Sequence, residues 1–304
     1  MNNEKGIVII GAGHPIYGQM AANLAASIKR HEDIPVIIYT TPGSMTEHLK
    51  NQLIDKCGVE ILPLPQETYL VSDDPTGRPN YYRAKTWADN LSPFQKTLFL
   101  DADTIWLTAI KPSTVFEQLD GHEFTMSNEG YIDIKSRQWH STNFYVIWAE
   151  LEDILQVYGK KMGDRLYIHR SECFYFKKTK TTRAFFQTAR SIYDNPKMHI
   201  QKAGGKQPDE FAFNVASAIT KLYPHQDKYA MAYWAFRNRQ VTGSWMNKYQ
   251  VQYKFPLLSI GGRGMGTMKK YYLEMSEAHF KHFGLRGYEA VPDKADVLPE
   301  RRKQ

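Results

Sequence analysis

The feature that most constrains the fold is an alternation of short apolar runs and helical patterns in the first part of the chain. The apolar runs are residues 6–10, 36–39 and 59–62, and the helical patterns cover residues 18–30 and 44–58. Later in the chain we expect helices over about 81–91, over 112–119 and over 144–158, and one over 209–219 with Pro208 at its first turn. The second helical pattern starts with a capping-box pair, Ser44 and Glu47, and ends at Gly58. Strands that alternate with helices favour parallel pairing. We therefore expect an α/β fold with a mostly parallel central sheet flanked by helices.

A glycine loop, residues 11–13, follows the first predicted strand. Such a loop between a strand and a helix is typical of dinucleotide-binding proteins. Here the next glycine is Gly18, so the spacing is G-x-G-x-x-x-x-G rather than G-x-G-x-x-G. The second strand runs into Thr40 and Thr41, with no acidic residue to hold a ribose. Both departures argue against a dinucleotide site.

Two carboxylates, Asp101 and Asp103, follow the apolar run 97–100, which predicts a short buried strand. Mg²⁺ and Mn²⁺ prefer oxygen ligands, and one or two carboxylates suffice where phosphate and water complete the shell. Asp101 and Asp103 could therefore hold a metal ion against a diphosphate. The ordinary alternative for a D-x-D sequence is a turn with solvated acids or a helix cap.

The D-x-D segment, with apolar runs on both sides and about a third of the chain before it, resembles that of glycosyltransferases with the nucleotide-diphospho-sugar (GT-A) fold. The likeness is greatest to the glycogenin and lipopolysaccharide galactosyltransferase group, and it spans roughly residues 6–265. It implies a GT-A-like (Rossmann-like) fold with Mn²⁺ or Mg²⁺ at Asp101 and Asp103. It also implies sugar transfer from a nucleotide diphosphate sugar, with UDP-sugars favoured and the anomeric configuration retained.

Three residues match the nucleotide-binding positions of this family. Gly11 and Tyr17 match its first loop and the tyrosine near the base, and Lys85 matches a basic residue that contacts the donor. The resemblance therefore implies that these residues bind the donor. The alternatives are a Tyr17 that packs on its own helix and a Lys85 that is an exposed surface residue.

Two carboxylates are candidates for the catalytic centre. Asp209 matches the aspartate of the family's Asp-Gln-x-x-x-Asn segment, which lies by the donor sugar and acceptor, whereas Glu210 replaces the glutamine. Glu172 falls in a strand that lies beside the donor sugar in the family, but it departs from the Asn-Ser-Gly pattern there. The alternatives are a helix N-terminal acid for Asp209 and an ion pair with Arg170 or Lys177 for Glu172.

The third protein ligand of the metal stays open. Residues 257–264 resemble the late strand and glycine loop where the family has a metal-binding histidine, but Ser259 stands near that place. His279 and His282 lie on a later predicted helix and are weaker candidates, because lone histidines are more often structural.

Length and composition indicate one globular domain. The chain has 304 residues, of which 42% are hydrophobic, enough to bury a sizeable core. We expect a GT-A-like domain over residues 1–290, with a nucleotide-binding half (about 1–120) and an acceptor half (about 121–290). The fold would include a smaller C-terminal acceptor lobe. Residues 291–304 would form a basic, flexible tail. Cys57 and Cys173 lack metal-ligand spacing, so we expect buried free thiols.

No apolar stretch is long enough for a membrane span, and the first one is too short for a signal peptide, so we expect a cytoplasmic protein. The net charge of +7 suits anionic partners such as a nucleotide sugar. A glycan, small molecule or protein is the favoured acceptor. Basic clusters at 177–183, at Arg237 and Arg239, and at Arg301 and Arg302 would also allow a polyanion such as modified DNA.

Two other classes fit parts of the sequence. A haloacid-dehalogenase-like phosphatase also has an apolar strand followed by D-x-D, and would use Asp101 and Asp103. That family places Thr or Val two residues after the second aspartate, where this chain has Ile105. A non-catalytic nucleic-acid-binding protein would use the basic charge and the aromatic residues, but no compact binding motif is present.

Overall fold

The computed structural model describes residues 4–70, 79–107, 109–141, 147–202, 206–234, 248–261 and 265–286. The strands are β1 (Lys5–Gly11), β2 (Val36–Thr40), β3 (Glu60–Pro63), β4 (Lys96–Asp101), β5 (Thr104–Trp106), β6 (Phe124–Asp133), β7 (Trp139–Ser141), β8 (Arg165–Lys177), β9 (Ala232–Trp234) and β10 (Leu257–Ser259).

The α-helices are α1 (Pro15–His31), α2 (Glu47–Cys57), α3 (Tyr81–Lys85), α4 (Ala88–Leu91), α5 (Pro112–Leu119), α6 (Leu151–Tyr158), α7 (Lys180–Asp194), α8 (Asp209–Thr220), α10 (Lys248–Lys254) and α11 (Met265–His282). Two short 3₁₀ helices, η1 (Gln66–Thr68) and η2 (Gly159–Lys161), complete the elements.

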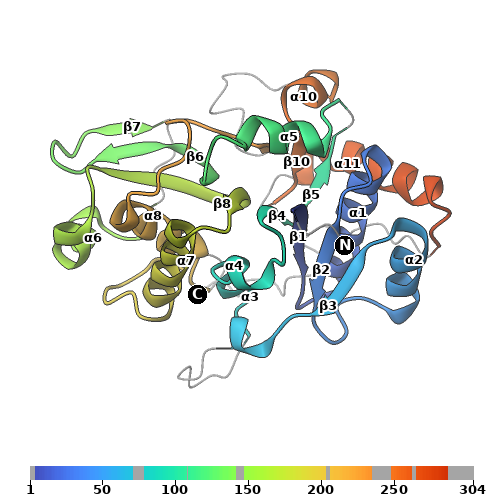
Figure 1. Cartoon of the computed structure of the whole chain (residues 1–304), viewed down its shortest axis with the longest axis horizontal. Helices are drawn as coiled ribbons and strands as arrows, with labels where there is room; N and C mark the ends of the chain where they lie inside the picture. The colour runs from blue at the N-terminus through green and yellow to red at the C-terminus, as the bar shows by residue number, and fades with distance from the viewer. Residues whose placement is uncertain are drawn as a thin grey trace.

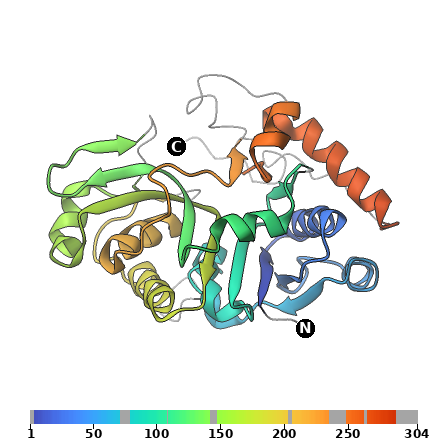
Figure 2. The same ribbon diagram turned by 45° about the horizontal axis from the view of Figure 1, so that its top comes forward.

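A seven-stranded sheet runs through the molecule in the order β3-β2-β1-β4-β8-β6-β7, and a three-stranded sheet has the order β5-β10-β9. The strands from β3 to β4 pair in parallel, while β8 pairs antiparallel with both β4 and β6. Helices cover both sides of the large sheet, and α11 lies along α1 at the far end from β7 (Figures 1 and 2). The predicted α/β fold is confirmed, and its parallel strands, β3 to β4, occupy the end of the large sheet opposite β7.

Successive residues of β1 belong to two different apolar cores. Ile7 and Ile9 pack in the core that includes α1 and α11, whereas Val8 packs in the core formed with α7 and α8. In the second core the rings of Phe99 and Phe174 stack with their centroids 4.6 Å apart. A central strand covered on both faces has to be apolar along its whole length, which explains the run that predicted it.

Two glycines of the first loop and helix allow close backbone approaches. A Cβ atom on Gly11 would lie 2.7 Å from the Cβ of Ala21, and one on Gly18 would lie 1.7 Å from the carbonyl oxygen of Ser44. Helix α1 can therefore pack on β1 and on the turn before α2 only if both positions lack a side chain.

Several predicted boundaries were wrong. The N-cap of α2 is Thr46 rather than Ser44, because the Ser44 hydroxyl bonds within its own turn to the Thr41 carbonyl. The helix expected over 81–91 is divided into α3 and α4. The helix expected over 144–158 starts at Leu151, since Trp148 has a left-handed φ of 65°. Pro208 caps α8 instead of lying in its first turn.

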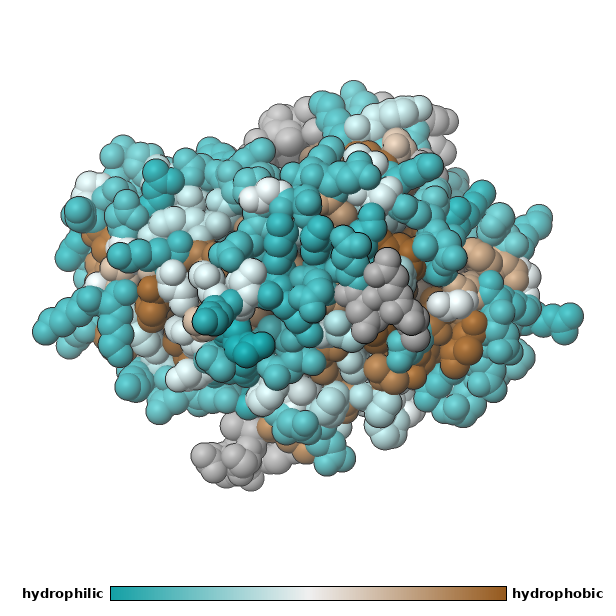
Figure 3. All heavy atoms as spheres, viewed as in Figure 1, coloured by the Kyte–Doolittle hydropathy of each residue, from teal (hydrophilic) through white to brown (hydrophobic). Residues whose placement is uncertain are grey.

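Cys57 and Cys173 are buried and unpaired, as predicted. In the parts of the chain that the structure describes, no helix is long and apolar enough to cross a bilayer. Hydrophilic side chains cover most of the face in Figure 3, with smaller apolar patches between them. The expected tail at 291–304 lies outside the described residues, and the division into two halves stays a prediction.

Candidate active site

The carboxyl ends of β1 and β4 lie at the same edge of the large sheet, where the register pairs Ile10 with Asp101. Asp101 ends β4, and Asp103 lies in the turn that leads into β5. The Thr104 hydroxyl donates to the Asp101 carbonyl at 2.8 Å, and the Ile260 amide donates to the Asp103 carbonyl at 2.9 Å. Both sheets therefore hold the D-x-D turn in place.

Lys85, the last residue of α3, connects three parts of this site. Its Nζ lies 2.7 Å from Oδ2 of Asp101, 3.5 Å from Oδ2 of Asp209 and 3.2 Å from the Ser171 hydroxyl. Its side chain is only 11% exposed, so Lys85 is not a surface lysine. The structure therefore brings together Lys85, Asp101 and Asp209, which are far apart in the sequence.

Burial and the neighbouring carboxylates have opposite effects on the pKa of Lys85. Burial disfavours the Lys85 ammonium, but the negative charges of Asp101, Asp209 and Asp103 hold the pKa of Lys85 well above its usual range. Burial raises the pKa of Asp101 to about 7, and the charge of Asp103 adds to this rise while Lys85 opposes it. The site thus holds more negative charge than Lys85 neutralises, which is the electrostatic demand that a bound cation meets.

Glu172 lies on β8, where the register places Cys173 opposite Leu100 of β4. Its Oε1 is 3.1 Å from Nη2 of Arg170, and Nη1 of Arg170 is 3.9 Å from Oε1 of Glu129. All three charged residues are buried. The ion pair that was the alternative for Glu172 therefore exists, and sequence reasoning did not find its second carboxylate, Glu129.

A further acidic group lies in the first turn of α8. The Trp148 indole Nε1 donates to Oε2 of Glu210 at 2.7 Å. Burial raises the pKa of Glu210 to about 8, with the charges of Asp209 and Glu172 adding to the rise. The sequence contains no pattern that identifies Trp148, because its contact depends on the backbone turn before α6.

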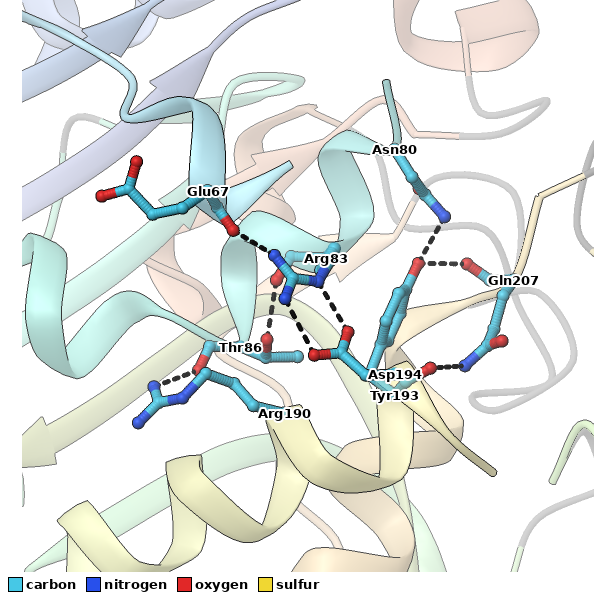
Figure 4. Close-up of polar contacts among 8 residues, drawn as sticks. All are labelled: Glu67, Asn80, Arg83, Thr86, Arg190, Tyr193, Asp194 and Gln207. Carbon is cyan, nitrogen blue, oxygen red and sulfur yellow. Dashed lines mark hydrogen bonds and ion pairs between the residues drawn. The ribbon is translucent and has the colours of Figure 1, made fainter. Parts of the chain in front are cut away.

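Figure 4 shows how α3 is held in position by α7 and the segment before α8. Arg83 forms two bonds to Asp194, of 2.6 and 2.8 Å, and also donates to the Glu67 carbonyl. The Tyr193 hydroxyl accepts a bond from Asn80 and donates to the Gln207 carbonyl at 2.9 Å. Since Lys85 follows Arg83 on the same short helix, these contacts place its ammonium between the carboxylates.

Three further residues singled out from the sequence lie near the D-x-D turn. Gly11 ends β1 and Tyr17 lies in the first turn of α1, so both are at the same edge as Asp101. Tyr17 is partly buried against the apolar core of α1. Ser259 pairs with Thr104 and so lies beside Asp103.

The two histidines lie elsewhere. His279 is buried against the C-terminal turn of α1, with its ring 5.9 Å from that of His31. That end of α1 is at the sheet edge opposite the D-x-D turn, because the helix returns from the carboxyl end of β1. The ring of His282 lies against that of Phe283 on the same helix end. Among the described residues, no three or more His, Cys, Asp or Glu side chains form a ready metal cage.

Part of the basic run 177–183 also lies at the opposite edge. Lys177 pairs with Lys96 at the start of β4, five residues before Asp101, which is about 16 Å along a strand. Lys178 and Arg183 line a surface hollow of about 360 Å³ together with Asp89. This run therefore does not border the carboxylate cluster. Arg237, Arg239, Arg301 and Arg302 lie outside the described residues.

Comparison with solved structures finds glycosyltransferases that match over most of the chain. LgtC, a galactosyltransferase solved with donor and acceptor sugar analogues, matches with a TM-score of 0.55 and 13% identity, over 96% of this chain and 99% of its own. The glycosyltransferase GlyE of Streptococcus pneumoniae TIGR4 matches with a TM-score of 0.53 and 12% identity, over 92% of this chain and 63% of its own.

A third match is the bifunctional glycosyltransferase WbbM, with a TM-score of 0.57 and 12% identity over 92% of this chain. The match covers 52% of WbbM, so this chain spans about half the length of that protein. No protein-family model matches the sequence, and no curated protein sequence matches it either. The similarity thus lies in the arrangement of helices and strands, and this chain has the fold of the GT-A glycosyltransferases of the LgtC type.

Proposed function

We propose that this chain is a metal-dependent glycosyltransferase that moves a sugar from a nucleotide diphosphate sugar, with UDP-sugars favoured, to an acceptor with retention of configuration. The observation that carries the proposal is the position of Lys85, whose ammonium bonds Asp101 and lies 3.5 Å from Asp209 at the carboxyl edge of the parallel strands. In open α/β sheets, ligands bind at this edge. The proposal unites four of the residues that the sequence singled out, since Asp103 follows Asp101 in the same turn.

The oxygen ligands at the D-x-D turn suit a hard divalent cation. Asp101 and Asp103 would hold Mn²⁺ or Mg²⁺, with oxygen atoms of the diphosphate and water completing the shell. Burial and the neighbouring Asp103 raise the pKa of Asp101, and a bound cation would favour its ionised form. The metal would offset the negative charge that develops on the departing diphosphate.

The protein residues would have separate roles in the transfer. Lys85 would hold Asp101 and Asp209 in position and add positive charge near the diphosphate. Asp209, only 3% exposed, would lie beside the transferred sugar, where a carboxylate stabilises positive charge at the anomeric carbon. Gly11 and Tyr17, at the same sheet edge, would line the nucleotide side, and Glu172 would face the sugar from β8.

The comparisons support this class of reaction and leave the acceptor broad. LgtC is described with donor and acceptor sugar analogues, and WbbM and GlyE are described as glycosyltransferases. A glycan, small molecule or protein is the acceptor that we favour. An extended polyanion is less well supported, because the described basic run lies at the other edge of the sheet. No structural observation favours the phosphatase or the nucleic-acid-binding alternative.

Calorimetry with nucleoside diphosphates tests the proposal without an acceptor. UDP, GDP and ADP would be titrated into the protein with Mn²⁺ and again with a chelator. We expect one diphosphate to bind in a metal-dependent way, and Asp103→Asn to weaken it by about tenfold or more, as disturbed metal sites typically do. Asp55→Asn, which changes an exposed acid on α2, is the matched control. Equal affinity in Asp103→Asn, or in the wild type with chelator, would overturn the proposal.

A further inference from the structure

Glu210 is a carboxyl group at the candidate site to which the proposed chemistry assigns no role. It occupies the first turn of α8, next to Asp209, and Oε2 accepts a bond from the Trp148 indole at 2.7 Å. One carboxyl oxygen, Oε2, is therefore held by the indole.

The backbone at Trp148 has an unusual conformation. Its φ is 65°, in the left-handed region that a bulky aromatic residue rarely adopts. The turn is fixed by the Gln201 amide, which donates to the Trp148 carbonyl at 2.7 Å. The fold thus accepts an unfavourable conformation where it binds the carboxyl group of Glu210.

The groups around Glu210 disfavour its charge. The negative charges of Asp209, which precedes it on α8, and of Glu172 on β8 act on this carboxyl group, and the positive charge of Lys85 on α3 opposes them. Lys85 is engaged with Asp101 and Asp209, and Glu172 is paired with Arg170. Burial and the two carboxylates raise the pKa of Glu210 to about 8, and the Trp148 bond opposes the rise. The group is therefore mostly protonated at neutral pH.

We propose that Glu210 is a substrate-binding residue that works as a neutral acid, donating a hydrogen bond from its carboxyl group to an oxygen of the sugar beside Asp209. This inference rests on the proposed glycosyl transfer. Sugar hydroxyls both donate and accept hydrogen bonds. Glu210 would be a neutral hydrogen-bond donor, and the carboxylates of Asp209 and Glu172 would be acceptors. Together they can pair with a sugar hydroxyl both as acceptor and as donor. A carboxylate at position 210 would offer no donor and would add negative charge near the diphosphate.

The pH dependence of turnover tests this role. With UDP-glucose and Mg²⁺ as the probe, donor hydrolysis would be followed between pH 6 and pH 9.5. A single acid with a pKa of about 8 loses about tenfold of its protonated form between pH 7 and pH 9, so wild-type turnover should fall by about that factor. In Glu210→Gln the amide can donate a hydrogen bond at every pH in this range. The fall in turnover on the alkaline side, the alkaline limb of the profile, should therefore disappear.

Two further variants separate this role from a structural one. Trp148→Phe removes the N–H that stabilises the carboxylate, so the alkaline limb should move to higher pH. Glu117→Gln, an exposed residue on α5, should keep the wild-type profile. The same alkaline limb in the wild type and in Glu210→Gln, or a limb that moves to lower pH in Trp148→Phe, would overturn the proposal.

A titration followed by NMR gives a readout that needs no turnover. In protein labelled with ¹³C at glutamate carboxyl groups, one resonance should titrate near pH 8 and should be missing in Glu210→Gln. If Glu210 titrates below about pH 6 instead, it is an ordinary carboxylate and the inference is wrong. Failure to bind any nucleoside diphosphate would count against the glycosyltransferase function, and the NMR result would still decide the protonation state of Glu210.

Discussion

At the scale of single residues, the site depends on one ammonium group shared among carboxylates. Lys85 bonds Asp101 at 2.7 Å and Ser171 at 3.2 Å, and it lies 3.5 Å from Asp209. Removing a buried charge leaves its partners desolvated and unpaired, which costs more than the pair itself contributes. A variant that lacks the Lys85 ammonium should therefore be less stable than the wild type.

We expect Lys85→Met to keep the apolar stem and to destabilise the fold by about 3 kcal/mol, the cost typical of breaking a buried ion pair. Urea denaturation measures this change. Lys50→Met is the control, because Lys50 pairs with an exposed Glu47 on α2 and should change stability by less than about 1 kcal/mol. Similar stability losses in the two variants would mean that the Lys85 cluster is not strongly coupled.

For Asp209→Asn we expect turnover to fall by about a hundredfold or more while donor affinity changes little. A carboxylate beside the transferred sugar acts mainly as positive charge develops in the transition state. Donor titration and turnover of the same variant give the two quantities. A variant with normal turnover would return Asp209 to the role of a helix N-terminal acid.

At the scale of elements, close packing of α1 sets the edge of the sheet where the site lies. A methyl group at Gly18 would meet the Ser44 carbonyl oxygen at 1.7 Å, a contact that only a shift of the backbone can relieve. Helix α3 depends on side-chain contacts instead, because it is short and is fixed by Arg83 and Asp194. The two elements should therefore respond differently to substitution.

Gly18→Ala should destabilise the protein by about 2 kcal/mol or more, because overpacking against a backbone group forces α1 away from the turn. Gly121→Ala is a matched control, since a Cβ there meets nothing within 4 Å. We expect that control to change stability by no more than about 1 kcal/mol. Chemical denaturation of both variants decides whether the close approach has this cost.

At the scale of the whole molecule, α11 packs against α1 and buries a histidine at their contact. His279 is 1% exposed, and burial lowers its pKa to about 3, with Arg30 adding to the effect. The folded protein therefore keeps this ring neutral at pH values where the unfolded chain protonates it. Below about pH 6.5, this group makes folding less favourable as the pH falls.

His279→Leu should remove this acid sensitivity. The difference in unfolding free energy between the wild type and the variant should change by about 2 kcal/mol from pH 7 to pH 5, with the wild type losing more. His48→Leu, at an exposed position on α2, should show no such trend. If the difference in unfolding free energy between the wild type and His279→Leu stays constant with pH, the buried ring takes up its proton as readily in the folded protein as in the unfolded chain.

Local patterns in the sequence were enough to predict the strand before the D-x-D turn and the boundaries of α5, Pro112–Leu119. Apolar periodicity and turn residues act over a few neighbours, so they can be read without a fold. They also identified the D-x-D carboxylates, whose position at a strand end is local. Boundaries were wrong where a distant contact decides them, as at Trp148, whose indole bonds Glu210 on α8.

The sequence by itself determined an α/β chain with two carboxylates at the end of a central strand, because strand and helix periodicity and the spacing of the pair are local properties. The tertiary structure alone decided that Lys85 and Asp209 meet Asp101, that Glu129 lies 3.9 Å from Arg170, and that His279 lies away from the D-x-D turn. These contacts join residues far apart in the chain, and their energies depend on burial and distance, which no local pattern contains.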